Sequence, residues 1–169
     1  MTAPAHFEIR IAEHADAEAI AHFAAQSFCD TFAHLYPPED LAAHLAKNYN
    51  AALQAEELAD PELRYWVARQ DARLVGYAMA GPVDLAVTHA PHDRELYRLY
   101  VDASVKGAGV ADALMREVLA WTAGALWLSV WENNTRAQGF YKRYGFEHMG
   151  EHKFMVGSVA DRDFVWRRP

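Results

Sequence analysis

The sequence predicts one α+β domain over residues 1–169, in which a mixed, mostly antiparallel sheet of about seven strands is flanked by helices. Two observations lead to this prediction. The chain has 169 residues, of which 52% are apolar and 23% charged, a balance typical of a globular domain with one core. Runs with strand periodicity alternate with runs of helical periodicity, and no repeat or low-complexity linker divides them.

The elements follow from periodicity and from their start and stop signals. Asp16 is placed to N-cap the first helix, and two consecutive prolines open the second. Gly124 and Gly145 are expected to end the last two helices, and residues 82–93 form a loop. We expect strands over 7–11, 65–69, 73–81, 95–102, 126–131, 146–154 and 163–167, and helices over 15–32, 37–47, 50–58, 110–123 and 134–144.

Composition excludes several classes of partner. The formal net charge is −7, and no run of Lys or Arg precedes the last few residues, so we expect no nucleic-acid partner. An acidic surface favours a cationic ligand, although solubility explains the charge more simply. No apolar run reaches the roughly 18–20 residues that span a bilayer, and residues 1–10 do not read as a signal peptide, so no membrane partner is expected.

Cysteine usage indicates a reducing compartment. Cys29 is the only cysteine, so no internal disulfide can form and the cytoplasm is the expected location. Nothing in the composition decides the oligomeric state, and a homodimer stays open.

A glycine-rich loop at 106–111 follows the strand expected at 95–102 and leads directly into the helix expected at 110–123. Gly107 and Gly109 let the backbone approach a ligand closely and adopt positive φ. The helix after them begins with backbone N–H groups that lack partners, and such groups at the positive end of a helix bind phosphate. The loop could also serve only as a turn, so its spacing leaves both roles open.

Two nucleotide-binding motifs fit this loop poorly. The nucleotide P-loop ends in Gly-Lys-Ser/Thr, whereas here Gly109 is followed by Val and Ala. The dinucleotide fingerprint would use Gly107, Gly109 and Asp112, with Glu132 as the acid that binds ribose. Too little chain follows the loop for a doubly wound sheet, which makes this interpretation weak.

Two motifs of the chain occur in the order and spacing of a known family. Lys106-x-x-Gly109-x-Ala111 follows Leu99-Tyr100-Val101, and further on comes Asn134-Thr-Arg-Ala137-Gln-Gly-Phe140-Tyr141-Lys-Arg-Tyr-Gly145-Phe146. Both resemble motifs of the GNAT superfamily of acetyl-coenzyme-A-dependent N-acetyltransferases. The family's first motif begins with Gln or Arg, so Lys106 is a departure that keeps the positive charge. Arg143 stands where the second motif has lysine.

The resemblance implies a GNAT fold and acetyl-CoA as co-substrate. It implies that strand 95–101 separates from strand 126–131, so that the pantetheine arm pairs with the backbone of Val101 while nearby N–H groups stabilise the oxyanion. Tyr141 would protonate the departing thiolate. The implied cofactor-binding residues are Leu99, Tyr100, Val101, Lys106, Gly107, Ala108, Gly109, Val110, Ala111, Asn134, Ala137 and Tyr141.

Acetyl transfer to an amine also requires a base. An amine like that of lysine has a pKa near 10.4, so removing its proton at pH 7 costs about 4–5 kcal/mol, and a carboxylate can take it, often through water. Glu95 is the first candidate because it opens the strand beside the expected acetyl position, and Glu132 is the second. Either carboxylate could also lack a catalytic role. Arg98 is expected to contact the substrate or to pair with Glu95.

The fold does not decide which amine accepts the acetyl group. Residues 27–45 and 95–101 resemble the PaiA-like branch of bacterial spermidine/spermine acetyltransferases, and an acidic chain suits a polyamine. The expected activity is acetyl transfer, by direct attack in a ternary complex, to a primary amine of a polyamine-like small molecule or of a peptide. The alternative is a non-catalytic acyl-CoA-binding or sensor module. His89, His92 and Asp93 lack the arrangement of a metal site, so no metal is expected.

Overall fold

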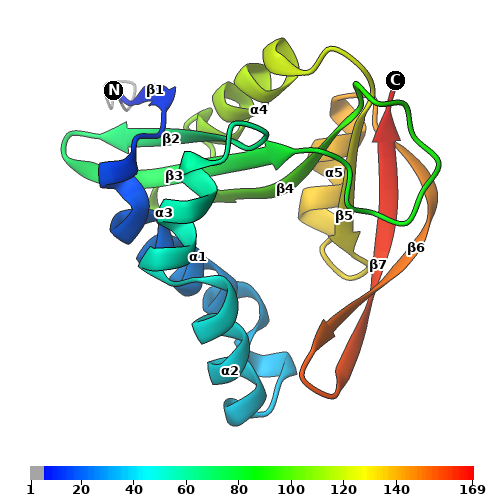
Figure 1. Cartoon of the computed structure of the whole chain (residues 1–169), viewed down its shortest axis with the longest axis horizontal. Helices are drawn as coiled ribbons and strands as arrows, with labels where there is room; N and C mark the ends of the chain where they lie inside the picture. Colours follow the sequence, from blue (N-terminus) through cyan, green and yellow to red (C-terminus); the bar gives the residue numbers. More distant parts are fainter. Residues whose placement is uncertain (1–5) are drawn as a thin grey trace.

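A seven-stranded sheet forms the frame of the structure, a computed structural model that describes residues 6–169 (Figure 1). The strands run in the order β1-β2-β3-β4-β5-β7-β6, and all neighbours pair antiparallel except β4 and β5. This confirms the predicted mixed, mostly antiparallel sheet. The strands are β1 (Glu8–Ile11), β2 (Arg64–Gln70), β3 (Arg73–Gly81), β4 (Arg94–Val101), β5 (Leu126–Trp131), β6 (Glu147–Val156) and β7 (Val159–Arg168).

Helices cover both faces of this sheet and divide the core in two. On one face α4 packs against β2, β3 and β4, over a core that includes Val75, Leu96, Leu114 and Leu128. On the other face α1 and α3 enclose a second core around Tyr77 (Figure 1). The helices are α1 (Ala17–Phe32), α2 (Pro38–Asn48), α3 (Ala51–Ala59), α4 (Val110–Trp121) and α5 (Thr135–Arg143). In the part of the chain that the structure describes, no helix is long and apolar enough to cross a membrane.

Gly124 does not end α4 as the sequence predicted. The helix stops at Trp121, and the hydroxyl of Thr122 donates to the carbonyl of Val118 at 2.8 Å. A Cβ on Gly124 would lie 2.5 Å from the His92 ring and 2.7 Å from a carboxylate oxygen of Asp93. Glycine is therefore required here for close approach of two segments rather than for a left-handed helix cap.

The hairpin of β6 and β7 is longer than the sequence predicted. The two strands pair from Asp163 on towards the turn, and the last pair joins Val156 to Val159. Only Gly157 and Ser158 remain in the turn. The polar residues Asp161 and Arg162 hid the extension of β7 from a hydrophobicity pattern. The hydroxyl of Ser158 donates to the Asp40 carboxylate at 3.3 Å, which ties the tip of the hairpin to α2.

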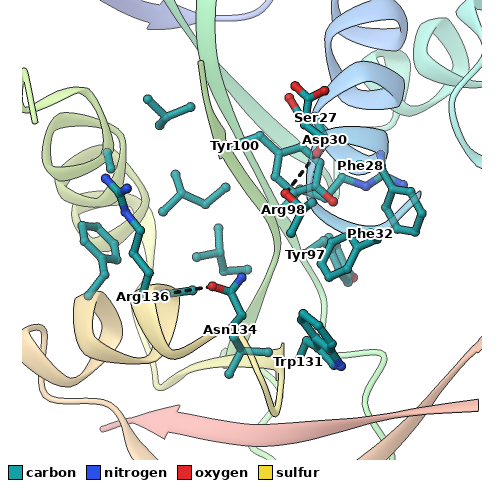
Figure 2. A pocket seen from close by; sticks show the side chains of 18 of the residues that line it. Ser27, Phe28, Asp30, Phe32, Tyr97, Arg98, Tyr100, Trp131, Asn134 and Arg136 are labelled. Carbon is teal, nitrogen blue, oxygen red and sulfur yellow. Dashed lines mark hydrogen bonds between the residues drawn. The ribbon is translucent and has the colours of Figure 1, made fainter. Parts of the chain in front are cut away.

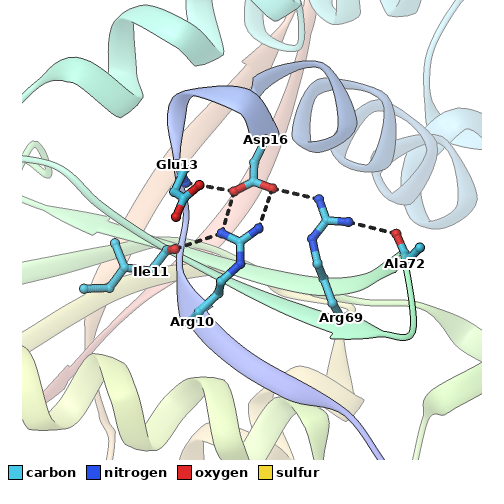
Figure 3. A network of polar contacts seen from close by, with 6 residues as sticks. All are labelled: Arg10, Ile11, Glu13, Asp16, Arg69 and Ala72. Carbon is cyan, nitrogen blue, oxygen red and sulfur yellow. Dashed lines mark hydrogen bonds and ion pairs between the residues drawn. The ribbon is translucent and has the colours of Figure 1, made fainter.

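Asp16 precedes α1 but does not cap it, contrary to the expectation. Its backbone already belongs to a short 3-10 turn, His14–Asp16, so its side chain cannot bond to the first turn of the helix. The carboxylate instead accepts hydrogen bonds from Arg10 at 2.8 and 3.0 Å, from Arg69 at 2.7 Å and from the N–H of Glu13 at 2.8 Å (Figure 3). This network joins β1, β2 and α1.

The same network determines the pKa of Asp16. Burial acts to raise this pKa, but the hydrogen bonds from Arg10, Glu13 and Arg69 outweigh burial and lower it well below its ordinary value. A carboxyl whose pKa is lower in the folded state than in the unfolded chain stabilises the fold above its ordinary pKa. That stabilisation is lost as the pH falls towards the folded-state pKa.

Replacing Asp16 by Asn should therefore lower the free energy of unfolding by about 3 kcal/mol at neutral pH, because two arginines lose their buried counter-ion. Urea unfolding at several pH values measures this difference, which should stay constant above about pH 5 and shrink as the pH falls below the ordinary aspartate pKa of about 4. Glu18→Ala, in the exposed first turn of α1, is the matched control and should change the stability by less than about 0.5 kcal/mol. A pH-independent loss in Asp16→Asn would contradict the ionic role.

Candidate active site

Two neighbouring strands separate in the middle of the sheet. The strands β4 and β5 pair only between Arg94 and Leu126 and between Glu95 and Trp127, and beyond these pairs they diverge. We call this point the fork. A cleft of about 960 Å³ opens at the fork and runs between α4 and α5 on one side and α1 on the other (Figure 2). The separation of the two strands confirms what the resemblance implied.

A bulge in β4 lies just beyond the fork. The pairing with β3 shifts between Met79 and Ala80, so Tyr97 is an extra residue on β4. As a result Leu96 and Leu99 both belong to the core under α4, while Arg98 and Tyr100 face the helices on the other side. Without the bulge, Leu96 and Leu99 would face opposite sides of the sheet.

The glycine loop forms an open cradle at one end of the cleft. Gly107 and Gly109 have φ values of +85° and +86°, and no atom lies within 4 Å of a Cβ added to either residue. Ala113 is the first residue of the following helix whose N–H bonds to a carbonyl, that of Gly109. The N–H groups of residues 109–112 have no partner among residues 6–169. This cradle fits a pyrophosphate, because donors converge where no side chain blocks them.

The helix α5 forms the neighbouring wall. The side-chain oxygen of Asn134 accepts the N–H of Ala137 at 3.2 Å and so caps the helix, as predicted (Figure 2). Asn134, Ala137 and Tyr141 all line the cleft. Burial raises the pKa of Tyr141 above its ordinary value, so its hydroxyl is protonated at neutral pH.

Eleven of the twelve residues expected to bind acetyl-CoA line this cleft. Ala108 does not, because its side chain packs against the core under α4. The eleven are Leu99, Tyr100, Val101, Lys106, Gly107, Gly109, Val110, Ala111, Asn134, Ala137 and Tyr141.

Glu95 lies at the closed end of the fork and lines the cleft. Its side chain is buried, and one carboxylate oxygen accepts the N–H groups of Asp84 at 2.8 Å and Leu85 at 3.1 Å. Burial raises the pKa of Glu95, and these two hydrogen bonds act in the opposite direction. The carboxylate therefore holds the loop after β3, and its role as a base stays a prediction.

Glu132, the second candidate base, and Arg98 make their contacts with other residues than Glu95. The carboxylate of Glu132 accepts a hydrogen bond from Nε of Arg162 at 2.7 Å, on the exposed surface. The guanidinium of Arg98 lies 4.7 Å from the centre of the Tyr49 ring and makes no ion pair with Glu95. The expected pairing of Arg98 is therefore wrong, whereas its contact with substrate stays a prediction.

Sequence reasoning missed a pair of carboxylates on β7. Asp161 and Asp163 project from one face of the strand into the cleft, and Asp163 is only 7% exposed. Burial raises the pKa of Asp163 to about 6, against the effect of the neighbouring Ser129 hydroxyl. The hydroxyl of Tyr36 donates to Asp161. Asp161 and Asp163 stand four and two residues before the buried Val165, so they share its face of the strand. This spacing was the signal in the sequence that could have revealed them.

Aromatic side chains line the same end of the cleft as Asp161 and Asp163. We call this end the acceptor half. Phe32 and Trp131 (Figure 2) meet edge to face with ring centres 5.7 Å apart. Phe28 stacks on Tyr36 with ring centres 6.1 Å apart. The acceptor half thus combines apolar walls with carboxylates, an arrangement that suits an amine carried on an apolar chain.

Asp93, in the histidine segment before β4, has a structural function. Asp93 is buried and accepts hydrogen bonds from the N–H groups of Ala90 and Ala125 and from the indole of Trp127. Burial acts to raise the pKa of Asp93, but these hydrogen bonds, with the indole first, lower it below its ordinary value. Within residues 6–169, no group of three or more metal-ligand side chains comes together.

Comparisons with known proteins agree with this geometry. The family model of the Acetyltransferase (GNAT) family matches residues 22–146. An uncharacterized N-acetyltransferase of Mycobacterium tuberculosis is 37% identical over 157 residues, which cover 90% of this chain and 97% of that protein. The N-alpha-acetyltransferase RimI of the same species is 36% identical over 95 residues, covering 56% of this chain and 58% of that protein.

A solved structure shows the same fold. The PaiA N-acetyltransferase of Thermoplasma acidophilum, in complex with coenzyme A, superposes with a TM-score of 0.78 at 20% identity, covering 96% of this chain and 98% of that chain. The family model spans most of the chain and includes the glycine loop, the fork and α5. The chain therefore belongs to the GNAT family of acetyltransferases, and it is an acyltransferase enzyme.

Proposed function

We propose that this enzyme transfers the acetyl group of acetyl-CoA to a primary amine by direct attack in a ternary complex. The amine belongs to a polyamine-like small molecule or to a peptide. One observation carries the proposal: a single cleft joins the phosphate cradle at 106–111 to a half lined by carboxylates and aromatic rings, and the fork lies between them.

The cradle end is proposed to hold the cofactor. The unpaired N–H groups at the start of α4 and the side chain of Lys106 would bind the pyrophosphate. Beyond Glu95 the edge of β4 facing β5 has no strand partner, so it is free to pair with an extended pantetheine arm near Val101. The side chains of Asn134 and Ala137 would contact the same arm from α5.

Tyr141 is proposed to supply the proton that the departing sulfur requires. Its raised pKa keeps the hydroxyl protonated, and its place on α5 directs it into the cleft. Acetyl-CoA supplies an activated acetyl group when bound. Backbone N–H groups around the β4 bulge would stabilise negative charge on the carbonyl oxygen. A buried carboxylate of the cleft, Glu95 or one on β7, would take the proton of the amine.

The acceptor is proposed to be cationic. Carboxylates of Asp30, Asp161 and Asp163 line the acceptor half and attract an ammonium group. The similarity to RimI, named for acetylation of α-amino groups, supports a peptide N-terminus, whereas the net charge of −7 supports a polyamine. A cytoplasmic location, a homodimer and the absence of a resident metal stay predictions.

Release of coenzyme A thiol from acetyl-CoA, measured across a panel of amines, tests the function. The panel contains spermidine, simple diamines, amino acids and short peptides with free N-termini. We expect turnover with at least one amine. Binding of acetyl-CoA with no turnover on any amine would instead indicate a binding or sensor module.

The variant Gly109→Glu should abolish binding of acetyl-CoA, because a carboxylate would fill the cradle and repel the pyrophosphate. Titration calorimetry measures the dissociation constant. Gly109→Ala is the matched control, since it shares the unfavourable positive φ of about 1–2 kcal/mol but adds no charge. We expect the control to weaken binding by about tenfold at most. Unchanged affinity in Gly109→Glu would contradict the placement of the pyrophosphate.

The variant Tyr141→Phe should lower kcat by about 100-fold with little change in the affinity for acetyl-CoA, because only the proton donor is lost. Steady-state kinetics and calorimetry separate the two effects. Tyr144→Phe, whose hydroxyl donates to Asp112 at 2.6 Å, is the control and should keep kcat. Equal values of kcat in Tyr141→Phe and the wild type would remove Tyr141 from the mechanism.

A further inference from the structure

We propose that Asp163 is the carboxylate that removes the proton from the acceptor amine. This inference rests on the proposed acetyl transfer and assigns a step that the fold alone leaves open.

The position of Asp163 follows from strand register. Asp163 pairs with Trp131 on β5, and Ser129 pairs with Val165 on β7, so these side chains share one face of the sheet. Trp127 is the last residue of β5 that pairs with β4, and Ser129 comes two residues beyond it. The carboxylate therefore enters the cleft beyond the fork, opposite Trp131 at the end of β5 and on the same face as Ser129.

The alternative carboxylates are engaged in other contacts. One oxygen of Glu95 accepts two backbone N–H groups that hold the loop after β3. Asp161 accepts the hydroxyl of Tyr36, and Glu132 is paired with Arg162 outside the cleft. In the part of the chain that the structure describes, no backbone N–H group acts on the pKa of Asp163, and the group that hydrogen-bonds to its carboxylate is the Ser129 hydroxyl. Asp163 is thus the buried carboxylate of the cleft with the most capacity to accept a new proton.

The groups that face Asp163 explain its affinity for a proton. Burial raises its pKa, and Asp161 on the same strand adds to the effect. Ser129 on β5 and His152, which pairs with Asp163 from β6, act to lower this pKa. The balance leaves the pKa at about 6, so the group is ionised at neutral pH yet is a stronger base than an ordinary aspartate.

The proton and bond changes balance as follows. Asp163 takes one proton from the ammonium group and leaves a neutral amine with a free electron pair. The amine nitrogen forms a bond to the acetyl carbon, the bond between that carbon and sulfur breaks, and Tyr141 donates a proton to sulfur. The nitrogen then loses its second proton, which returns to Tyr141 through solvent. Asp163 releases its own proton to water.

The variant Asp163→Asn tests this role because the amide keeps the shape of the side chain but cannot accept a proton. With the best amine of the panel, kcat should fall by about 100-fold or more, while the dissociation constant for acetyl-CoA stays unchanged. The acidic limb of the profile of kcat/KM against pH, expected near pH 6, should disappear. Glu151→Gln, an exposed carboxylate on β6, is the matched control and should match the wild type.

A second variant keeps the test informative if Asp163→Asn does not fold. Ser129→Ala removes the hydroxyl that lowers the pKa of Asp163, so the acidic limb should move to higher pH. A limb that does not move would contradict the proposal and indicate that another group lining the cleft produces it.

Two further outcomes separate the inference from the function on which it rests. A large loss of kcat in Glu95→Gln, with Asp163→Asn close to the wild type, would overturn the assignment and make Glu95 the base. Absence of turnover by the wild-type enzyme with every amine would overturn the proposed function itself, whatever the variants do.

Discussion

The incomplete pairing of β4 with β5 is the constraint on which the rest of the structure depends. Two residue pairs hold the strands together, and beyond them each strand has one edge without a partner. Buried backbone groups need hydrogen bonds, so such edges persist only where they face water or a ligand. The outer edges are fixed by antiparallel pairing, of β4 with β3 and of β5 with β7. The fork can therefore stay open without loss of order on either side.

Two neighbouring buried carboxylates secure the closed end of the fork. Asp93 bonds to Ala125 and Trp127 at the start of β5, and Glu95 bonds to the loop after β3. Asp93 thus fixes where β5 begins relative to β4, and Glu95 fixes the segment that covers this end. A side chain in such a position contributes to activity through geometry even where it exchanges no proton.

Local features of the fold and site were predictable from the sequence, whereas features that depend on distant contacts were not. The glycine loop and the cap at Asn134 follow from neighbouring residues, and both form as predicted. The bulge at Tyr97 depends on how β3 and β4 align, and nothing in the sequence of β4 reveals it. The expected pair of Glu95 and Arg98 failed because a loop from elsewhere in the chain binds Glu95.

The position of Asp163 illustrates the same limit. Its strand was predicted to begin at this residue, which would leave the carboxylate at an exposed end. The observed strand begins at Val159, and its pairing with β5 carries Asp163 into the interior. Only the partner strand decides whether such a carboxylate faces solvent or a cleft.

Apart from Trp131, the two ends of the cleft come from different parts of the chain. One continuous stretch, from Glu95 to Tyr141, supplies the cradle, the fork and α5. The acceptor half instead joins the region of α1 and α2 to the hairpin of β6 and β7, through Tyr36 with Asp161 and Asp40 with Ser158. Substitutions in these two outer segments can reshape the pocket for the amine while the donor-binding stretch stays intact. The architecture thus separates the evolution of amine selectivity from the retention of acetyl-CoA binding.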